Sequence, residues 1–186
     1  MVTSFFIVWM PLLLLMGVLL YSPFYFLYHR RGVGNWRQLT YFCLFAVGLM
    51  IIFVTLLPVD FHPTTRFLNL RPLAWLSDPY AMGMMATTKQ LFINLLMFVP
   101  VTFFLAMVCP RWGIIRIMAI ALVLTASIET IQYFTGRSAD VDDLIVNFLG
   151  GLVGYGLFSL ANRGWRSKKF WRRLLGAPTK SEELQP

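Results

Sequence analysis

The sequence GRSADVDDLIVN at residues 136–147 places a short charged segment between two long apolar ones. It contains an arginine, three aspartates and an asparagine, whereas only 13% of the chain is charged and 58% is hydrophobic. The flanking segments, residues 114–134 and 144–161, approach the length of about 20 residues with which a helix crosses a bilayer. The stretch therefore predicts a polar site at the ends of two membrane-spanning helices, where charge is costly and usually functional.

Three further apolar segments of similar length lie at residues 4–28, 39–58 and 90–108. Because backbone polar groups in lipid must be bonded within their own segment, all five are expected to be α-helices. The predicted fold is an all-α integral membrane protein with about five transmembrane helices. Residues 1–162 form its transmembrane domain, and residues 163–186 form a tail that is basic and amphipathic at first and then disordered.

The basic residues predict the orientation of these helices. Twelve of the sixteen Lys and Arg residues fall between the first two helices, between the third and fourth, or in the tail. Loops rich in Lys and Arg remain cytoplasmic, so the N-terminus is expected outside and the C-terminus in the cytoplasm of a multi-pass plasma-membrane protein. The net charge of +8 does not indicate nucleic-acid binding, because no basic face with stacking aromatics is present.

Two segments outside the spans are unusually apolar. The loop at residues 59–88, on the predicted outer side, is too rich in Leu and Phe to stay in water, which favours a short interfacial helix or a re-entrant segment. Residues 165–175 of the tail mix aromatic and basic side chains. That pattern is typical of a helix on an anionic cytoplasmic leaflet, or of ordinary topological anchoring.

Polar side chains on three helices are expected to meet near the outer surface. Helical spacing puts them in three stripes: Gln90 and Asn94 on the third helix, Thr125, Glu129 and Gln132 on the fourth, and Asp140, Asp143 and Asn147 on the fifth. We expect Asp140 to be accessible, and Asp143 and Asn147 to be buried. The last stripe continues through Gly150 and Gly154, beside Gly151, and such small residues let two helix backbones approach closely.

Arg71 and Arg137 are two cations in the predicted outer loops. A guanidinium there either holds a phosphate or carboxylate of a ligand or, for Arg137, pairs with Asp140 or Asp142. The aspartates at 140, 142 and 143 are a weak candidate for a divalent cation, which prefers hard oxygen ligands. They lack EF-hand spacing, and a helix N-terminus also stabilises negative charge, so no metal or cofactor is assigned.

Several of these motifs resemble the VanZ-like family of bacterial membrane proteins, over about residues 57–160. NLRPL at 69–73 is similar to that family's Asn-Leu-x-Pro-Phe element, although Leu73 replaces the aromatic residue, and NLLMFVP at 94–100 is similar to its Asn-x-x-x-Phe-x-Pro helix. SIETIQ at 127–132 and GRSADVDD at 136–143 complete the resemblance. It implies structural roles for Pro72 and Pro100. It also implies a bacterial cell-membrane protein, in a family whose named member is associated with resistance to teicoplanin-type glycopeptides.

Three functions are compatible with these residues. In the first, a polar pocket binds or shields a membrane lipid, a lipid-linked cell-wall precursor or a lipoglycopeptide; its ligand-binding residues are Arg71, Asn94, Gln132, Arg137, Asp140, Asp142 and Asn147. In the second, an enzyme acts on a lipid-linked anionic head group held by Arg71 and Arg137, with Glu129 as general acid or base and with Asp140 and Asp143 orienting a nucleophile or a metal. In the third, the polar residues only assemble the helices.

Overall fold

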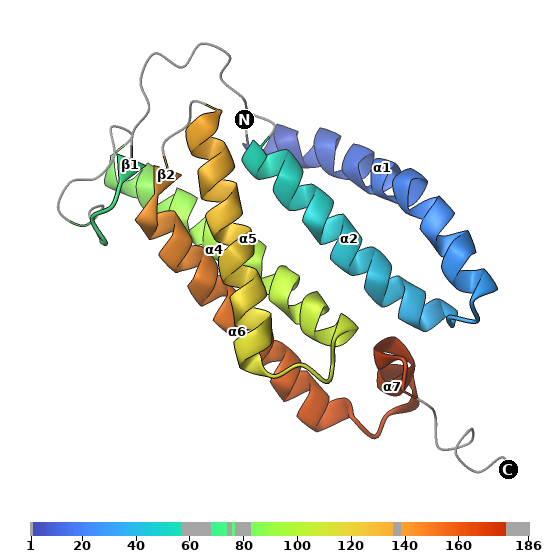
Figure 1. Ribbon diagram of the computed structural model, residues 1–186. Helices are drawn as coiled ribbons and strands as arrows, with labels where there is room; N and C mark the ends of the chain where they lie inside the picture. The colour runs from blue at the N-terminus through green and yellow to red at the C-terminus, as the bar shows by residue number, and fades with distance from the viewer. Residues whose placement is uncertain (1, 57–67, 74–75, 77–82, 136–138, 178–186) are drawn as a thin grey trace, which may run out of the picture.

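The computed structural model describes residues 2–56, 68–73, 76, 83–135 and 139–177, with side chains from residue 11 onward. Its elements follow the chain in the order α1 (Val2–Arg30), α2 (Asn35–Leu56), β1 (Leu68–Asn69), α4 (Met84–Val108), α5 (Ile114–Phe134), β2 (Ala139–Asp140), α6 (Val141–Trp165) and α7 (Lys169–Leu175). Figure 1 shows them as a bundle, with the two strands at one end and α7 at the other.

Five of the described helices, namely α1, α2, α4, α5 and α6, are long and apolar enough to cross a membrane. This finding confirms the predicted all-α membrane fold. Helices α1, α4 and α6 extend beyond the predicted apolar segments, whereas α5 has the predicted bounds; α6 begins at Val141 rather than at residue 144. It does so because the Asp140 carboxylate accepts the backbone N–H of Asp142 at 2.8 Å, a side-chain cap that satisfies one of the unpaired amides of the first turn.

The centre of the bundle is the pair α4 and α6. The α5 helix packs against α6, the α2 helix packs against α4, and α1 lies at the edge on α2 (Figure 1). Apolar side chains from α2, α4 and α5 form one core cluster, made of Ile51, Phe98, Val101 and Ile128. A second cluster near α7 contains Met107, Ile117, Phe158 and Trp171.

Glycines allow α4 and α6 to touch. A Cβ atom at Gly150 would collide with the backbone carbonyl of Leu95, and one at Gly154 would collide with that of Val99. The neighbouring Gly151 accepts a 2.8 Å hydrogen bond on its carbonyl from the Thr102 hydroxyl. Such small residues replace the hydrophobic driving force that helices lack in lipid, because they bring backbones into van der Waals contact.

The two short strands pair in parallel, with Leu68 opposite Ala139 and Asn69 opposite Asp140. This pairing was not predicted from the sequence. It lays the described part of the loop between α2 and α4 over the start of α6. The predicted interfacial or re-entrant segment of that loop falls mostly on residues outside the described ranges.

At the opposite end, Arg37 of α2 ties together three helices. Its guanidinium donates to the carbonyls of Met107 at 2.7 Å and Val108 at 2.6 Å, at the end of α4, and to that of Leu174 at 3.1 Å in α7. The Thr40 hydroxyl also donates to Leu174, at 2.9 Å. The last carbonyls of a helix have no partner within the helix, so this one cation satisfies the ends of two helices.

The tail helix α7 is held by protein contacts. Trp171 is only 2% exposed; it packs against Phe158, and its indole N–H donates to the Asn162 side chain at 2.9 Å. Arg173 and Lys169 point to the exposed side. Trp171 therefore faces the bundle, whereas Phe170 and the basic side chains of Lys169 and Arg173 remain exposed.

The glycine contact yields a first prediction. Gly150→Ala or Gly154→Ala should lower the melting temperature of the purified protein, because the added methyl group meets backbone that has no room to move; overpacking of this kind costs about 1–3 kcal/mol. Gly156→Ala is the matched control, since a Cβ there meets nothing within 4 Å on the same helix. Equal melting temperatures for the three variants in the same detergent would contradict the close contact.

Candidate functional site

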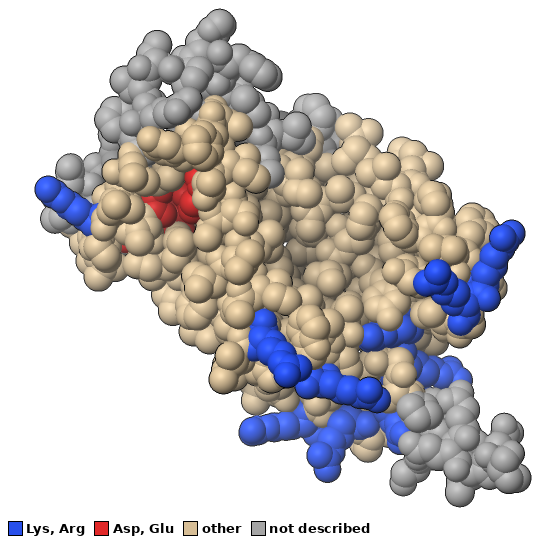
Figure 2. Space-filling model, in the orientation of Figure 1, with Lys and Arg blue, Asp and Glu red and all other residues tan. Residues whose placement is uncertain are grey.

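The acidic side chains that the structure describes gather at the end of the bundle that carries β1 and β2. Glu129 is 8% exposed, Asp140 6%, Asp142 1% and Asp143 7%. Figure 2 shows their surface at the end opposite to most of the Lys and Arg side chains. We call these four residues the acidic site. Carboxylates buried to this degree require hydrogen bonds, so the partners of each decide what the site can do.

Asp140 connects three elements. Its backbone N–H donates to Glu129 Oε2 on α5 at 3.0 Å, and its carboxylate receives the Asn69 amide of β1 at 3.1 and 3.2 Å while also capping α6. The expectation that Asp140 is accessible is wrong. The strand pairing with Asn69 covers it, and the sequence contains no signal for a pairing of two residues only.

Asp142 fixes the turn that follows β1. One carboxylate oxygen, Oδ1, accepts the backbone N–H of Leu73. Leu73 has φ of 61°, a left-handed conformation that a leucine adopts only when its surroundings impose it. The other oxygen, Oδ2, is buried and has no hydrogen-bond partner within the described part of the chain. An unsatisfied carboxylate oxygen of this kind is uncommon in native structures and calls for a ligand, water or ion.

Asp143 joins α6 to α4. The Asn94 amide donates to its Oδ1 at 2.8 Å, and the Gln90 amide lies 3.5 Å from its Oδ2, at the limit of a hydrogen bond. The predicted stripes of the third and fifth helices thus meet at this carboxylate. The contact spans the same helix pair that the glycines bring together.

Two further contacts join helices near the acidic site. The Asn147 amide donates to the Thr125 hydroxyl at 2.9 Å, which links α6 to α5. The Gln132 amide donates to the backbone carbonyl of Thr55 at 3.1 Å, which links α5 to α2. Both amides are buried interhelical donors: Asn147 lies deeper along α6 than the acidic site, whereas Gln132 lies near the end of α5.

The remaining predicted residues lie at the edge of the site or outside the described ranges. The side chain of Arg71 is exposed, and its backbone N–H donates to the Asn69 side chain at 3.1 Å. Pro72 is exposed beside it, whereas Pro100 is half-buried inside α4. Arg137 belongs to the residues that the structure does not describe. No group of three His, Cys, Asp or Glu within the described ranges is arranged to hold a metal ion.

Two participants were not selected from the sequence. Asn69 lies in the NLRPL element, where Asn and Pro signal a turn, but nothing in that signal says that its amide reaches a carboxylate 71 positions away. Thr55 contributes a backbone carbonyl, which no side-chain pattern can reveal. The acidic site is thus built from acceptors on α5, β2 and α6, with donors from α4, β1 and the following turn, and from the backbone of β2 and α6.

Comparison with known proteins agrees with the motifs. The family model described as VanZ/LLP1 matches residues 39–162, which confirms the resemblance given by the sequence. The protein named Protein VanZ from Enterococcus faecium is 30% identical over 88 residues, which are 47% of this chain and 55% of that protein. The chain therefore spans about half the length of this curated relative. No solved structure matches the chain.

The contacts of Asp140 give a second prediction. Asp140→Ala removes the cap of α6 and the acceptor for Asn69, and should destabilise the protein by at least the 1–2 kcal/mol or so that a lost cap costs. Asp140→Asn keeps an oxygen for both bonds, so it should melt close to wild type. Thermal unfolding in detergent compares the two variants. If Asp140→Asn were as unstable as Asp140→Ala, the negative charge rather than the cap would be the stabilising feature.

Proposed function

Because the chain belongs to the VanZ/LLP1 family, we propose that it is a VanZ-like protein of the bacterial cell envelope whose acidic site binds or shields a membrane amphiphile. Through this binding it lowers susceptibility to teicoplanin-type glycopeptides. The observation that carries the proposal is the buried Asp142 oxygen, which has no partner within the described residues.

This oxygen specifies part of the ligand. Leaving a buried carboxylate oxygen without a donor is costly, and an N–H or O–H group supplied from outside removes that cost. Hydroxyl or amine groups on a head group are donors of this kind, and a carboxylate acceptor gives stronger bonds than a neutral one. The acidic site therefore suits an amphiphile that carries several hydroxyl or amine groups, such as a sugar-bearing lipid.

Arg71 supplies the complementary charge. Its exposed side chain lies two residues after Asn69, whose amide binds Asp140, so a cation stands at the edge of an acceptor-rich site. A guanidinium binds phosphate through two parallel hydrogen bonds. A lipid-linked cell-wall precursor combines both features, because a phosphate joins its lipid to a polar head group. A lipoglycopeptide has the donors and the acyl chain but not the phosphate.

The proposal requires that the acidic site face outward. Figure 2 shows basic side chains concentrated at the other end, near the α1–α2 and α4–α5 connections and α7. Loops of this composition remain on the cytoplasmic side, so the acidic site lies in or near the outer leaflet. There it meets molecules of the outer surface, which are the targets of glycopeptides.

A second candidate function is assembly of the bundle alone. Three described hydrogen bonds favour it, since Glu129 with Asp140, Asn94 with Asp143 and Asn147 with Thr125 each join separate elements. On this interpretation the polar residues fix the helix register. The two functions differ in what happens when the charge of the site changes while its hydrogen bonds remain.

The orientation is a third prediction. Arg71→Cys and Arg166→Cys each place a thiol at an exposed position, at opposite ends of the bundle, in a chain whose Cys43 and Cys109 are replaced by Ser. A membrane-impermeant maleimide should label position 71 in intact cells, and position 166 only after permeabilisation. The reverse pattern would place the acidic site in the cytoplasm and overturn the proposed function.

A fourth prediction tests the acidic site. Produced in a teicoplanin-susceptible bacterium, the wild-type chain should raise the inhibitory concentration of teicoplanin. Asp142→Asn replaces the unpartnered oxygen by a donor while keeping an acceptor for Leu73, and Glu129→Gln keeps an acceptor for the Asp140 amide. Both variants should fold. A buried hydrogen bond to a charged group contributes about 1.5–3 kcal/mol, so ligand affinity that depends on one such bond should fall at least tenfold in each variant.

The matched control for this test is Thr130→Val, a change of similar size on an exposed position of α5 next to Glu129. It should keep both the phenotype and the melting temperature. If Asp142→Asn and Glu129→Gln keep the phenotype, or if the wild-type chain has no effect on teicoplanin, the binding proposal is wrong. A fall in melting temperature that accompanies every loss of phenotype supports the assembly function instead.

A further inference from the structure

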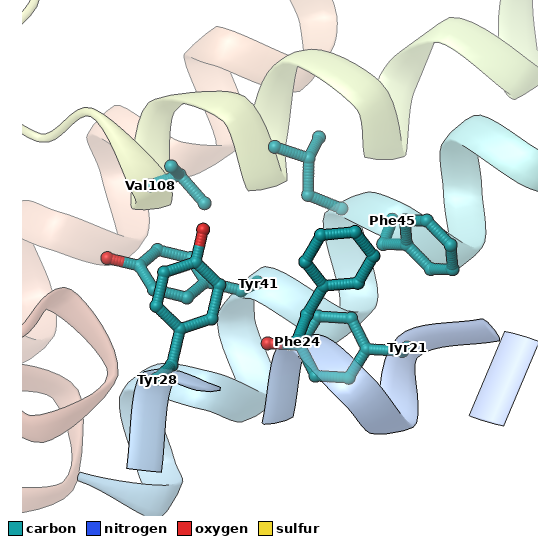
Figure 3. Close-up of a pocket in the computed structure, with 7 residues that line it drawn as sticks. Tyr21, Phe24, Tyr28, Tyr41, Phe45 and Val108 are labelled. Carbon is teal, nitrogen blue, oxygen red and sulfur yellow. The ribbon is translucent and has the colours of Figure 1, made fainter. Parts of the chain in front are cut away.

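A cavity of about 560 Å³ lies near the basic end of the bundle, far along the helices from the acidic site. Its walls come from three helices: Tyr21, Phe24 and Tyr28 of α1, Tyr41, Leu44 and Phe45 of α2, and Val108 of α4. Figure 3 shows the rings of α1 and α2 below Val108, with α4 above them. We call this cavity the aromatic groove. Its volume is within the range of roughly 300–1,000 Å³ that ligand pockets occupy.

The aromatic groove exists because α1 and α2 meet through large rings. The centroids of Tyr28 and Tyr41 are 5.4 Å apart, and those of Tyr21 and Phe42 are 5.5 Å apart. Side chains of this size pack well on one another but hold α1 away from α4. Smaller residues at these positions would let the helices pack more closely. The result is an open slot within the membrane-spanning part of the molecule.

The lining suits a hydrocarbon chain. Aside from the phenol oxygens, the side chains that line the groove are apolar. The Tyr21 hydroxyl already has a hydrogen-bond partner within the protein, because it donates to the Gln38 backbone carbonyl at 3.2 Å. Tyr28 lies two residues before the end of α1, so the aromatic groove reaches the level where the hydrocarbon core gives way to head groups. A molecule that fills it has its polar part at that level.

Exposed cations lie close in the sequence to the lining residues at the ends of α1 and α4. Arg30 and Arg31 follow Tyr28 and are exposed, and Arg111 follows Val108 and is also exposed. The Arg37 guanidinium lies 4.8 Å from the centre of the Tyr41 ring, but its hydrogen bonds go to backbone carbonyls, so it contributes charge rather than direct contact. The described acidic residues all belong to the acidic site, at the opposite end.

We propose that the aromatic groove binds one acyl chain of an anionic phospholipid, whose phosphate is held by Arg30 and Arg31. The apolar lining selects a chain, and the positive charge of Arg30 and Arg31, far from every described acidic side chain, selects a negative head group. A zwitterionic lipid satisfies only the first requirement. The site is separate from the acidic site, and it does not depend on the function proposed there or on which leaflet that site faces.

The experiment compares phosphatidylglycerol with phosphatidylcholine of the same acyl chains, each added to the purified full chain in detergent. Binding is followed by native mass spectrometry and by the shift in melting temperature. Phosphatidylglycerol should bind about thirtyfold more tightly, given a contribution of about 1 kcal/mol from each of two arginines near the head group. Arg30→Gln with Arg31→Gln should abolish most of that preference without changing the fold, since both side chains are exposed.

Two controls separate the aromatic groove from general surface charge. Arg163→Gln with Arg166→Gln removes the same charge from exposed positions at the end of α6, and should leave the preference intact. Leu44→Trp fills the aromatic groove from α2 and should weaken binding of both lipids; Val108→Phe does the same from α4 and serves if Leu44→Trp fails to fold. Equal binding of the two lipids, equal effects of the two arginine pairs, or full binding to the filled variants would each overturn the proposal.

Discussion

The close approach of α4 and α6 determines where the buried polar side chains of this protein lie. Both helices begin at the acidic end and run parallel, and Gly150 and Gly154 seat against the carbonyls of Leu95 and Val99. Asn94 directly precedes Leu95, and side chains on a helix lean toward its N-terminus, so its amide reaches back to Asp143. The hydrogen bond at the acidic site is thus a consequence of the glycine contact two turns along α6.

The acidic site is stabilised by its position as well as by its partners. Asp140 caps α6, and Asp142 and Asp143 lie in the first turn, where the unpaired amides of a helix favour negative charge. Carboxylates at the start of α6 therefore cost less there than elsewhere in a membrane protein. At the opposite end, the C-termini of α1, α4 and α6 favour positive charge, so the molecule has two differently charged ends.

The sequence predicted what depends on local pattern. Five spans follow from apolar length, and the stripes that carry Asn94, Asp143 and Gly150 follow from helical spacing. Contacts between distant segments were not predictable in this way. The strands pair only two residues each, too few for an alternating pattern, and that pairing buries Asp140 against expectation. Arg37 was counted only as a topological charge, because its role depends on the ends of α4 and α7 meeting beside α2.

The two kinds of helix contact explain why polar and apolar recognition separate within one small bundle. Glycines on α6 let its backbone touch that of α4. This contact leaves little space between the two helices, and it holds their polar groups close enough to bond to one another. Aromatic rings between α1 and α2 keep the first helix away from α4 and leave the aromatic groove open to hydrocarbon. Within the described residues, Asp142 Oδ2 is the buried carboxylate oxygen of the acidic site that this close packing leaves without a hydrogen-bond partner, so the proposed binding depends on that atom.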